Sequence, residues 1–474
     1  MKPDLSAELI ALFGEEIVLL DQESIQAHSV DWWPIAIKEK QQGRLPWKPD
    51  VVVRPNEIEQ VQQVLSWANT HKVAVTPWGL GSGVTGAALA VHGGISLDLS
   101  ALNRLIDLDE ESLIVRVQAG MNGLELERAL NLRGYTLNHS PQSLDRSSVG
   151  GWVATKAIGQ FSTRWGGIED LALSVKVALP SGELVETPLG PRAATGPNLV
   201  QLFIGSEGTL GVIVEIVLRI FPIADYRCYE AAIFPDVSTG LRAMRQTLRH
   251  GLRPFLLRLY DVDEARRLMK DPEYMHCLML LGFEGVENVA RAEYSSTIEI
   301  CRLEGGQPIG QGPVLDWMER RFDFTTVENY QNQPGGYAET IEVADFWGGI
   351  LETYHSLKIG LRPFSEEVLG HFSHSYTQGT SLYLILLGRA INDSAAQAQL
   401  SSIWETAMRI CLERGAVISH HHGIGLARGV YLQQALGSSG FLLEKIKRAL
   451  DPHAIMNPGK LNVSSIPPPI SLKE

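Results

Sequence analysis

Cysteine is scarce in this sequence. The 474 residues include four cysteines, Cys228, Cys277, Cys301 and Cys411, and none of them is spaced as C-x-x-C. This scarcity excludes a fold stapled by disulfides, and the spacing gives no cysteine zinc site. We therefore expect a protein of a reducing compartment, the cytoplasm, and we predict no metal site.

Positive charge is in deficit as well. Lysine and arginine total 41 against 54 aspartates and glutamates, which gives a formal net charge of −13. No basic stripe runs along the chain to neutralise a phosphate backbone. Nucleic-acid binding is therefore not expected.

Long hydrophobic segments are also missing. The long uncharged run at residues 73–97 contains Pro77 and six glycines, which do not suit a helix embedded in lipid. The first residues, MKPDLSAELIALFGEE, carry acids where a secretory signal has a basic end and an apolar stretch. We expect neither a transmembrane span nor a cleaved signal.

The composition is otherwise that of a large globular protein. Hydrophobic residues make up 45% of the sequence and charged residues 20%. At about 100–200 residues per domain, this length predicts two or three domains. We divide the chain into a helical lead-in (1–45), a glycine-rich domain (46–224), a second domain (225–440), and a C-terminal helix and tail (441–474).

The two large segments differ in pattern. The first alternates short β-rich runs, such as DVVVRP and LIVRVQAG, with glycine-rich turns, which indicates an α+β fold without regular βαβ winding. The second begins with strands 229–234, 254–261 and 276–283 and helices 237–250 and 286–303, an order typical of a ferredoxin-like half. A second half is expected from helices 345–358 and 394–415, strands 368–374 and 380–388, and a last strand, AVISHHH.

One loop matches G-x-G-x-x-G, from Gly81 to Gly86. A Rossmann site also needs a helix that begins at this loop and holds the pyrophosphate at its N-terminus, and the following residues are too short for one. The glycines can instead let backbone N–H groups converge on an anion, with the hydroxyls of Ser82 and Thr85 as further donors. A purely structural cluster of turns is the alternative, but two more loops rich in glycine and hydroxyls follow at 141–157 and 206–212.

These three loops resemble the FAD-binding domain of the vanillyl-alcohol oxidase type, also called the PCMH type. The first resembles P-x-G-G-G-[ST] with Leu80 for a glycine, the second resembles P-D-S…S-x-V-G-G with Gln142 for the aspartate, and SEGTLGVI matches closely. With HGIG and DP…MNPGK the resemblance covers residues 46–462. It implies an α+β fold, a two-subdomain PCMH-type FAD-binding domain with a ferredoxin-like α+β cap, and FAD bound non-covalently. The residues it assigns to FAD are Pro77, Trp78, Gly79, Leu80, Gly81, Ser82, Gly83, Pro141, Gln142, Ser143, Ser147, Ser148, Gly150, Gly151, Ala154, Thr155, Ala157, Glu207, Gly208, Thr209, Leu210, Gly211 and Ile213.

Within this superfamily, the segments VGGWVAT, SYTQGTSLY and HHHGIG resemble alkyl-dihydroxyacetonephosphate synthase. That family exchanges the acyl chain of acyl-dihydroxyacetonephosphate for a fatty alcohol through a covalent adduct on FAD, without net redox change. The resemblance implies a small-molecule substrate pair, an acylated ketone phosphate and a fatty alcohol, and allows a homodimer. It implies catalytic or substrate-binding roles for Tyr383, His420, His421, His422, Arg258, Arg321 and Arg428.

A second branch, the FAD-linked dehydrogenases of 2-hydroxy acids such as glycolate and D-lactate, is the alternative. That branch carries H-x-G-D-G-N-x-H and E-H-G-I-G, whose histidines help to hold a metal. Here Ser381 stands at the second histidine position counted from His374, and His421 replaces the glutamate. A third possibility is a non-catalytic subunit that binds FAD weakly.

Each candidate also has a structural interpretation. Tyr383 lies in the apolar run SLYLILL and is a core tyrosine on the simplest interpretation. In a strand His420 and His422 point one way and His421 the other, so a metal site of all three is disfavoured. Arg258 and Arg321 suit a phosphate or carboxylate but also surface salt bridges, and Glu207 and Asp170 are expected to organise loops.

Overall fold

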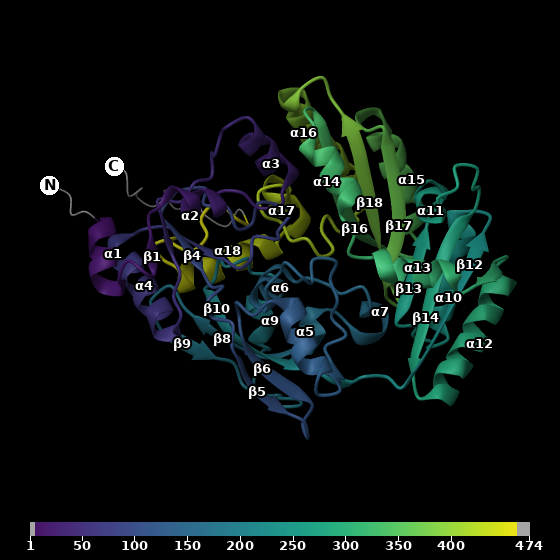
Figure 1. Cartoon of the computed structure of the whole chain (residues 1–474), viewed down its shortest axis with the longest axis horizontal. Helices are drawn as coiled ribbons and strands as arrows, with labels where there is room; N and C mark the ends of the chain where they lie inside the picture. The colour runs from purple at the N-terminus through teal and green to yellow at the C-terminus, as the bar shows by residue number, and fades with distance from the viewer. Residues whose placement is uncertain (1–4, 462–474) are drawn as a thin grey trace.

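The computed structural model describes residues 5–461. Figure 1 shows two bodies side by side, with the N-terminal half and the last helices in one and the green segments in the other. The part of the predicted tail beyond residue 461 lies outside the described residues. None of the helices within residues 5–461 is long and apolar enough to cross a membrane.

The first sheet has four strands in the order β1-β2-β4-β3, and β2, β4 and β3 are parallel. Helix α4 packs on it through Val61, Val64, Leu65 and Ala68, which recur at helical spacing and are all fully buried. The elements are α1 (Leu5–Phe13), β1 (Val18–Leu19), α2 (Gln22–Ala27), α3 (Pro34–Gln41), β2 (Val51–Val53), α4 (Ile58–His71), β3 (Val75–Trp78) and β4 (Ile95–Asp98).

The second sheet has five antiparallel strands in the order β5-β6-β10-β8-β9. The turn PSGE (180–183) joins β8 to β9, and its residue Gly182 has a φ of +89° that favours glycine. The elements are β5 (Leu105–Asp109), β6 (Ile114–Gln118), α5 (Gly123–Asn131), β7 (Tyr135–Thr136), α6 (Val149–Thr155), α7 (Ser162–Trp165), α8 (Ile168–Leu171), β8 (Ala172–Ala178), β9 (Leu184–Glu186), α9 (Val200–Phe203), β10 (Val212–Arg219) and β11 (Phe221–Pro222).

Residues 226–414 form a cap built on one seven-stranded sheet, in the order β15-β12-β14-β13-β17-β18-β16. Its two halves meet where β13 pairs with β17 over two residue pairs. The second half has the order β-α-β-β-α, and the first half has the same order with α11 added between β13 and β14. The elements are β12 (Tyr226–Phe234), α10 (Val237–Arg249), β13 (Leu256–Tyr260), α11 (Val262–Met269), β14 (Cys277–Gly285), α12 (Glu287–Leu303), β15 (Gln307–Gly310), α13 (Gly312–Arg320), α14 (Thr325–Asn332), β16 (Gly336–Phe346), α15 (Ile350–Leu361), a 3₁₀ turn (Arg362–Phe364), β17 (Glu367–Ser375), β18 (Gly379–Arg389) and α16 (Asp393–Arg414).

The two faces of the cap sheet differ in what they contact. Leu257, Leu259 and Phe372 belong to the core under helices such as α10, α15 and α16, whereas the alternate residues Arg258 and His371 line a cavity on the other face. This alternation follows from the period of two along a strand. The structure confirms the predicted α+β class, with a cap that packs over the first body.

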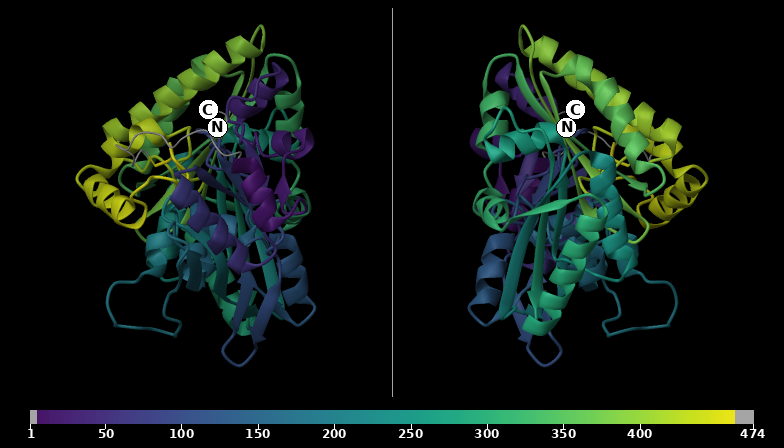
Figure 2. Two further views of the ribbon diagram at one scale, coloured as in Figure 1. Left: turned by 90° about the vertical axis from the view of Figure 1, so that its left-hand side faces the viewer. Right: turned by 90° about the vertical axis from the view of Figure 1, so that its right-hand side faces the viewer.

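The last part of the chain returns to the first body. Helix α16 leads down from the cap to α17 (Gly429–Leu436) and α18 (Ser439–Leu450) (Figure 2). Val75 of β3 then bonds to residues that follow α18, donating to the carbonyl of Ile455 at 2.8 Å and accepting from Asn457 at 2.8 Å. Residues that follow the cap in the sequence therefore form hydrogen bonds with β3 of the first sheet.

The predicted last strand, AVISHHH, does not form as a strand. Val417 makes an isolated bridge with Ala344, and the backbone then turns away from the sheet. The reason is Glu342, whose buried carboxylate collects the next backbone N–H groups, so they cannot pair with a strand.

Candidate functional site

A cavity of about 630 Å³ lies between the glycine-rich loops of the first body and the inner face of the cap sheet. The loops at 77–83, 141–151 and 207–213 all contribute to its wall. Of the residues assigned to FAD by sequence, Thr209 and Leu210 do not line the cavity, and the others do. The structure thus brings the three loops together around one space.

The first loop is suited to a pyrophosphate. Leu80, Gly81, Ser82 and Gly83 line the cavity, and their backbone N–H groups have no acceptor within residues 5–461. Free N–H groups that converge at a cavity are donors for an anion. Gly81 has a φ of +68°, and no helix begins in this loop, as predicted.

The second loop packs directly against the first. Ser148 caps α6 by accepting a hydrogen bond from the backbone N–H of Gly151 at 3.2 Å, and a Cβ at Gly79 would collide with its Oγ. A Cβ at Gly150 would lie 2.6 Å from the side chain of Ala119. These contacts leave no room for side chains at Gly79 and Gly150, so the wall of the cavity is formed by backbone at these positions.

Four side chains on the inner face of the cap sheet form a row across neighbouring strands. The backbone register pairs Tyr260 with His371, His371 with Tyr383, and Tyr383 with Glu342. The rings of His371 and Tyr383 stack with centroids 4.9 Å apart. The register therefore brings Tyr383, a candidate acid or base, close to residues up to about 120 positions away in the sequence.

Arg258 lies beside this row. Its Nη2 donates to Nε2 of His371 at 2.7 Å, and its Nε donates to the Tyr260 hydroxyl at 3.0 Å. Because arginine is only a donor, Nδ1 of His371 must carry the ring proton, which it donates to the Glu264 carboxylate at 2.9 Å. Burial lowers the pKa of His371, and the charge of Arg258 also lowers it, so the ring is neutral.

Arg321 follows α13 of the cap and reaches residues of the first body. Its Nη1 donates to Ser140 Oγ at 2.8 Å and to Gln160 Oε1 at 2.6 Å. Burial lowers its pKa to about 10. Within residues 5–461 neither Arg258 nor Arg321 forms an ion pair with a carboxylate, in contrast to the surface salt bridges considered from the sequence. Both arginines line the cavity, and within residues 5–461 neither guanidinium contacts an acidic side chain directly.

Tyr383 lines the same cavity. Its ring contacts His371 of β17 and two histidines of the loop that follows α16. Its ring stacks on His421 with centroids 5.9 Å apart and meets His422 edge-on at 5.5 Å. Burial raises its pKa, and the nearby carboxylate of Glu342 raises it further, while a hydrogen bond to Thr340 lowers it. The phenol is therefore protonated near neutral pH.

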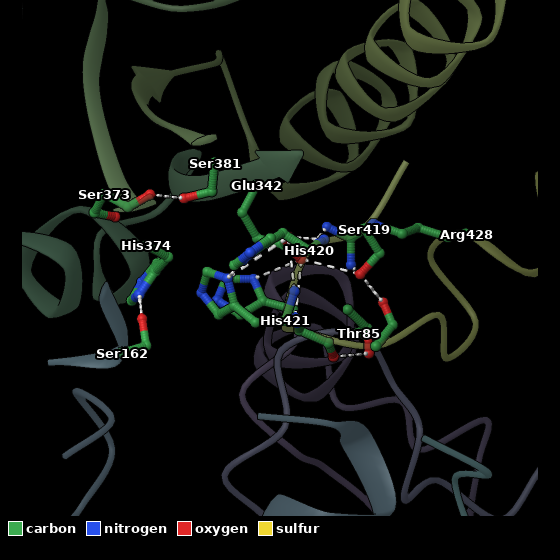
Figure 3. A network of polar contacts seen from close by, with 12 residues as sticks. Thr85, Ser162, Glu342, Ser373, His374, Ser381, Ser419, His420, His421 and Arg428 are labelled. Atoms are coloured by element: carbon green, nitrogen blue, oxygen red, sulfur yellow. Dashed lines mark hydrogen bonds and ion pairs between the residues drawn. The ribbon is translucent and has the colours of Figure 1, made fainter. Parts of the chain in front are cut away.

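The three histidines are arranged by Glu342 (Figure 3). This fully buried carboxylate accepts hydrogen bonds from the backbone N–H groups of His420, His421 and His422, the latter two at 3.1 and 3.0 Å. Burial acts to raise the pKa of Glu342, but the charge of Arg428 lowers it, and the pKa lies well below the usual range. Glu342 is thus an anion enclosed by donors.

The ring directions differ from the expected strand alternation. His421 and His422 both line the cavity, whereas His420 turns toward Tyr376. The cause is again the turn over Glu342, which replaces the strand geometry on which the alternation was based. Burial lowers the pKa of His420 and His421 to about 3 and that of His422 to about 4.

Arg428 supports this loop and does not line the cavity. It is fully buried, donating to Glu342 Oε1 at 2.8 Å and to the Gly423 carbonyl at 2.6 Å. Glu207 holds the other end of the loop, because its carboxylate accepts from the backbone N–H groups of Ile424 and Gly425 at 2.5 and 2.9 Å. Asp170 likewise accepts from the N–H of Gly167 at 3.0 Å, so both acids organise loops.

Sequence reasoning missed His371, Glu264, Glu342 and His374. The pair H-x-x-H at His371 and His374 was a signal beside Tyr383, but Glu342 has none, since its partners lie about 80 residues away. Buried His374 accepts or donates a hydrogen bond with Ser162 Oγ at 2.8 Å, across the two bodies.

Comparisons with known proteins agree with this geometry. Residues 49–188 match the FAD binding domain family, and residues 223–461 match the C-terminal domain of the FAD linked oxidases. An uncharacterized FAD-linked oxidoreductase of Escherichia coli O157:H7 is 31% identical over 96% of this chain and 97% of its own. The fold and the site thus define an FAD-dependent oxidoreductase-type enzyme. The chain belongs to the family of FAD-linked oxidases, and its cofactor is FAD.

Two characterised groups are also similar. Alkyldihydroxyacetonephosphate synthase of Dictyostelium discoideum is 27% identical over 88% of this chain and 74% of its own. A mitochondrial cytochrome-type D-lactate dehydrogenase of Arabidopsis thaliana is 30% identical over 89% and 74%. Among solved structures, an alkyldihydroxyacetonephosphate synthase superposes with a TM-score of 0.81 at 24% identity, covering 97% of this chain and 85% of that one. The p-cresol methylhydroxylase structure gives 0.81 at 14% identity, covering 100% and 98%.

Proposed function

We propose that this protein is an FAD-dependent enzyme that acts on a small anionic substrate by alkyl-for-acyl exchange on an ester of dihydroxyacetone phosphate. The observation that carries the proposal is the pair Arg258 and Arg321, two cavity arginines without a carboxylate partner among residues 5–461. A buried guanidinium without a counter-charge is suited to an anionic ligand such as phosphate. The similarity to alkyldihydroxyacetonephosphate synthases supports this substrate class.

The side chains around the cavity then have distinct tasks. Arg258 and Arg321 bind and orient the phosphate. In its ionised form Tyr383 takes up a proton from the carbon that bears the ester and later returns it, and His421 and His422 donate hydrogen bonds to the leaving carboxylate. Bound FAD supplies an electrophilic, redox-active ring, and residues 77–83, 141–157 and 207–213 hold it.

Oxidation of a 2-hydroxy acid is a second candidate. The same arginines suit a carboxylate, and the D-lactate dehydrogenase of Arabidopsis thaliana covers 89% of this chain. In that case Arg258 would bind the carboxylate of the acid, and FAD would be the electron acceptor.

Anaerobic mixing separates the two candidates. The purified protein is mixed with palmitoyl-dihydroxyacetonephosphate, and separately with D-lactate or glycolate, while the visible absorption of the flavin is followed. We expect bleaching by the ester alone, reversed by a fatty alcohol without oxygen. Bleaching by a hydroxy acid that persists until an electron acceptor is added would overturn the exchange proposal and establish a dehydrogenase.

A further inference from the structure

A chain of three side chains leads from the protein surface into the cavity. Tyr376, in the turn between β17 and β18, is 38% exposed. Its hydroxyl lies 2.9 Å from Nε2 of His420, and Nδ1 of His420 lies 3.0 Å from Nδ1 of His421. His421 lines the cavity beside Tyr383. The contacts are thus continuous from solvent to the site.

The proton count of this chain has two neutral solutions. A hydrogen bond between two Nδ1 atoms requires that one carries a proton and the other a lone pair. When His421 carries it, Nε2 of His420 must hold the other ring proton and donate to Tyr376, and Nε2 of His421 is an open acceptor. When His420 carries it, Tyr376 donates to His420, and Nε2 of His421 holds a proton. The two solutions differ by one concerted shift along the chain.

We propose that Tyr376, His420 and His421 form a relay that exchanges protons between the cavity and solvent. A proton that arrives at Nε2 of His421 releases the proton on its Nδ1 to His420. His420 then passes its Nε2 proton to the Tyr376 oxygen, and the Tyr376 hydroxyl proton goes to water. Each group stays neutral, and the reverse order brings a proton in. The relay rests on the proposed function, which removes a proton from the substrate.

The rings of the relay are held in place from several sides. Glu342 accepts the backbone N–H groups of both histidines. His374 stacks on His420 with centroids 5.4 Å apart and meets His421 edge-on at 5.3 Å, and Ser162 fixes His374 by a hydrogen bond (Figure 3). Because the donors and acceptors are fixed, each proton moves only along a hydrogen bond that already exists.

A reaction that takes a proton from the substrate and later returns it fits this relay well. The first transfer leaves the chain in its second arrangement, and the return transfer resets it without any ring rotation. Without the relay, the same proton stays in the cavity and returns to the carbon from which it came. The relay therefore predicts that substrate hydrogen mixes with water.

Isotope washout tests this prediction. The holoenzyme converts palmitoyl-dihydroxyacetonephosphate, deuterated at the carbon that bears the ester, with hexadecanol in ordinary water, and mass spectrometry measures deuterium in the product. We expect the wild type to lose label and Tyr376→Phe to lose at least about tenfold less label per product formed. Equal loss per product in both proteins overturns the relay. Tyr135→Phe removes another exposed tyrosine hydroxyl, which bonds Glu110 far from the cavity, and should match the wild type.

A spectroscopic measurement tests the relay without any substrate. In histidine-selective ¹⁵N NMR of the holoenzyme without substrate, Tyr376→Phe should shift the Nε2 signal of His420 and the Nδ1 signal of His421, because both belong to one chain of hydrogen bonds. Unmoved signals overturn the relay. If neither the ester nor a hydroxy acid bleaches the flavin, the proposed function fails, and these signals alone decide the relay.

Discussion

Arg258 donates to Nε2 of His371 at 2.7 Å, and this contact fixes which nitrogen of the imidazole carries its proton. The histidine in turn donates to Glu264, so a neutral ring joins a carboxylate to a guanidinium that lines the cavity. The carboxylate thereby orients Arg258 without neutralising it by direct contact. An oriented and uncompensated guanidinium is what an anionic substrate requires.

Replacement of this arginine should weaken substrate binding. Arg258→Gln removes a charged donor, whose hydrogen bonds contribute about 1.5–3 kcal/mol, so KM should rise about 10- to 100-fold. Flavin content should stay at the wild-type level because Arg258 lies on the cap sheet. Steady-state kinetics measure the effect, and Arg249→Gln, at an exposed position at the end of α10, is the matched control. An unchanged KM would contradict an anion site here.

Tyr383 should control the chemical step more than binding. Removal of a general acid or base costs about 10²- to 10⁴-fold, so Tyr383→Phe should lower kcat by that range with little change in KM. Because burial raises the pKa of Tyr383, only a small fraction of the phenol is ionised at pH 7. This fraction grows with pH, so the wild-type rate should still rise between pH 7 and 9. Measurement of kcat between pH 7 and 9 tests this. A pH-independent rate in the wild type would exclude the phenolate as base.

Glu342 should matter first for stability. Glu342→Gln leaves Arg428 buried without a carboxylate, and loss of one partner of a buried ion pair costs about 3–5 kcal/mol. Glu339→Gln is the control, since burial raises the pKa of that carboxyl to about 7 and it is largely neutral at pH 6. Urea unfolding at pH 6 should place the first variant well below the second. Equal midpoints would mean that the Arg428 contact contributes little.

His139 should make stability depend on pH. It is 1% exposed, packs on Trp152, and neither ring nitrogen has a partner within residues 5–461. Burial lowers its pKa from 6.5 to about 3, so the unfolded chain binds a proton that the folded chain does not. Above pH 6.5 the buried His139 therefore leaves the stability at its full value. As pH falls from 6.5 toward 3, the free energy of unfolding decreases by about 1.4 kcal/mol per pH unit.

The matching measurement compares unfolding at pH 7 and pH 5. His139→Phe should remove about 2 kcal/mol of the loss that the wild type shows between these values. His276→Phe, at an exposed position, should leave the loss unchanged. The same slope in the His139 variant and the wild type would show that His139 is protonated in the folded protein.

The sequence predicted the parts of this site that depend on local chemistry. The three loops were recognisable because their glycines and hydroxyls suit a backbone that approaches a pyrophosphate. The structure brings all three loops to one cavity, where Gly79 lies against Ser148. Tyr383 could be named from the motif around it, although its apolar strand alone favoured a core role. The strands and helices of the cap followed from hydrophobic periodicity.

The remaining features depend on contacts between distant residues. Glu342 reads as an ordinary strand residue until β16 pairs with β18 and the loop at 419–422 folds over it. His371 gains its role from Arg258 and Glu264, which are more than 100 residues away. The predicted directions of the histidine rings were wrong because the strand on which they were based does not form and is reduced to an isolated bridge at Val417.

The backbone bonds between Val75 and residues 455–457 bear on how the protein is made. The amide nitrogen of Asn457 donates to Val75, and its side chain donates to the carbonyls of Ala87 and Glu207, so segments on both sides of the first glycine-rich loop and in the third loop are braced by residues translated after the cap. While the ribosome is still synthesising the cap, the nascent first body lacks this brace. We therefore expect FAD to be captured after translation of the cap rather than during it, which makes flavin content a report on chains that have completed both bodies.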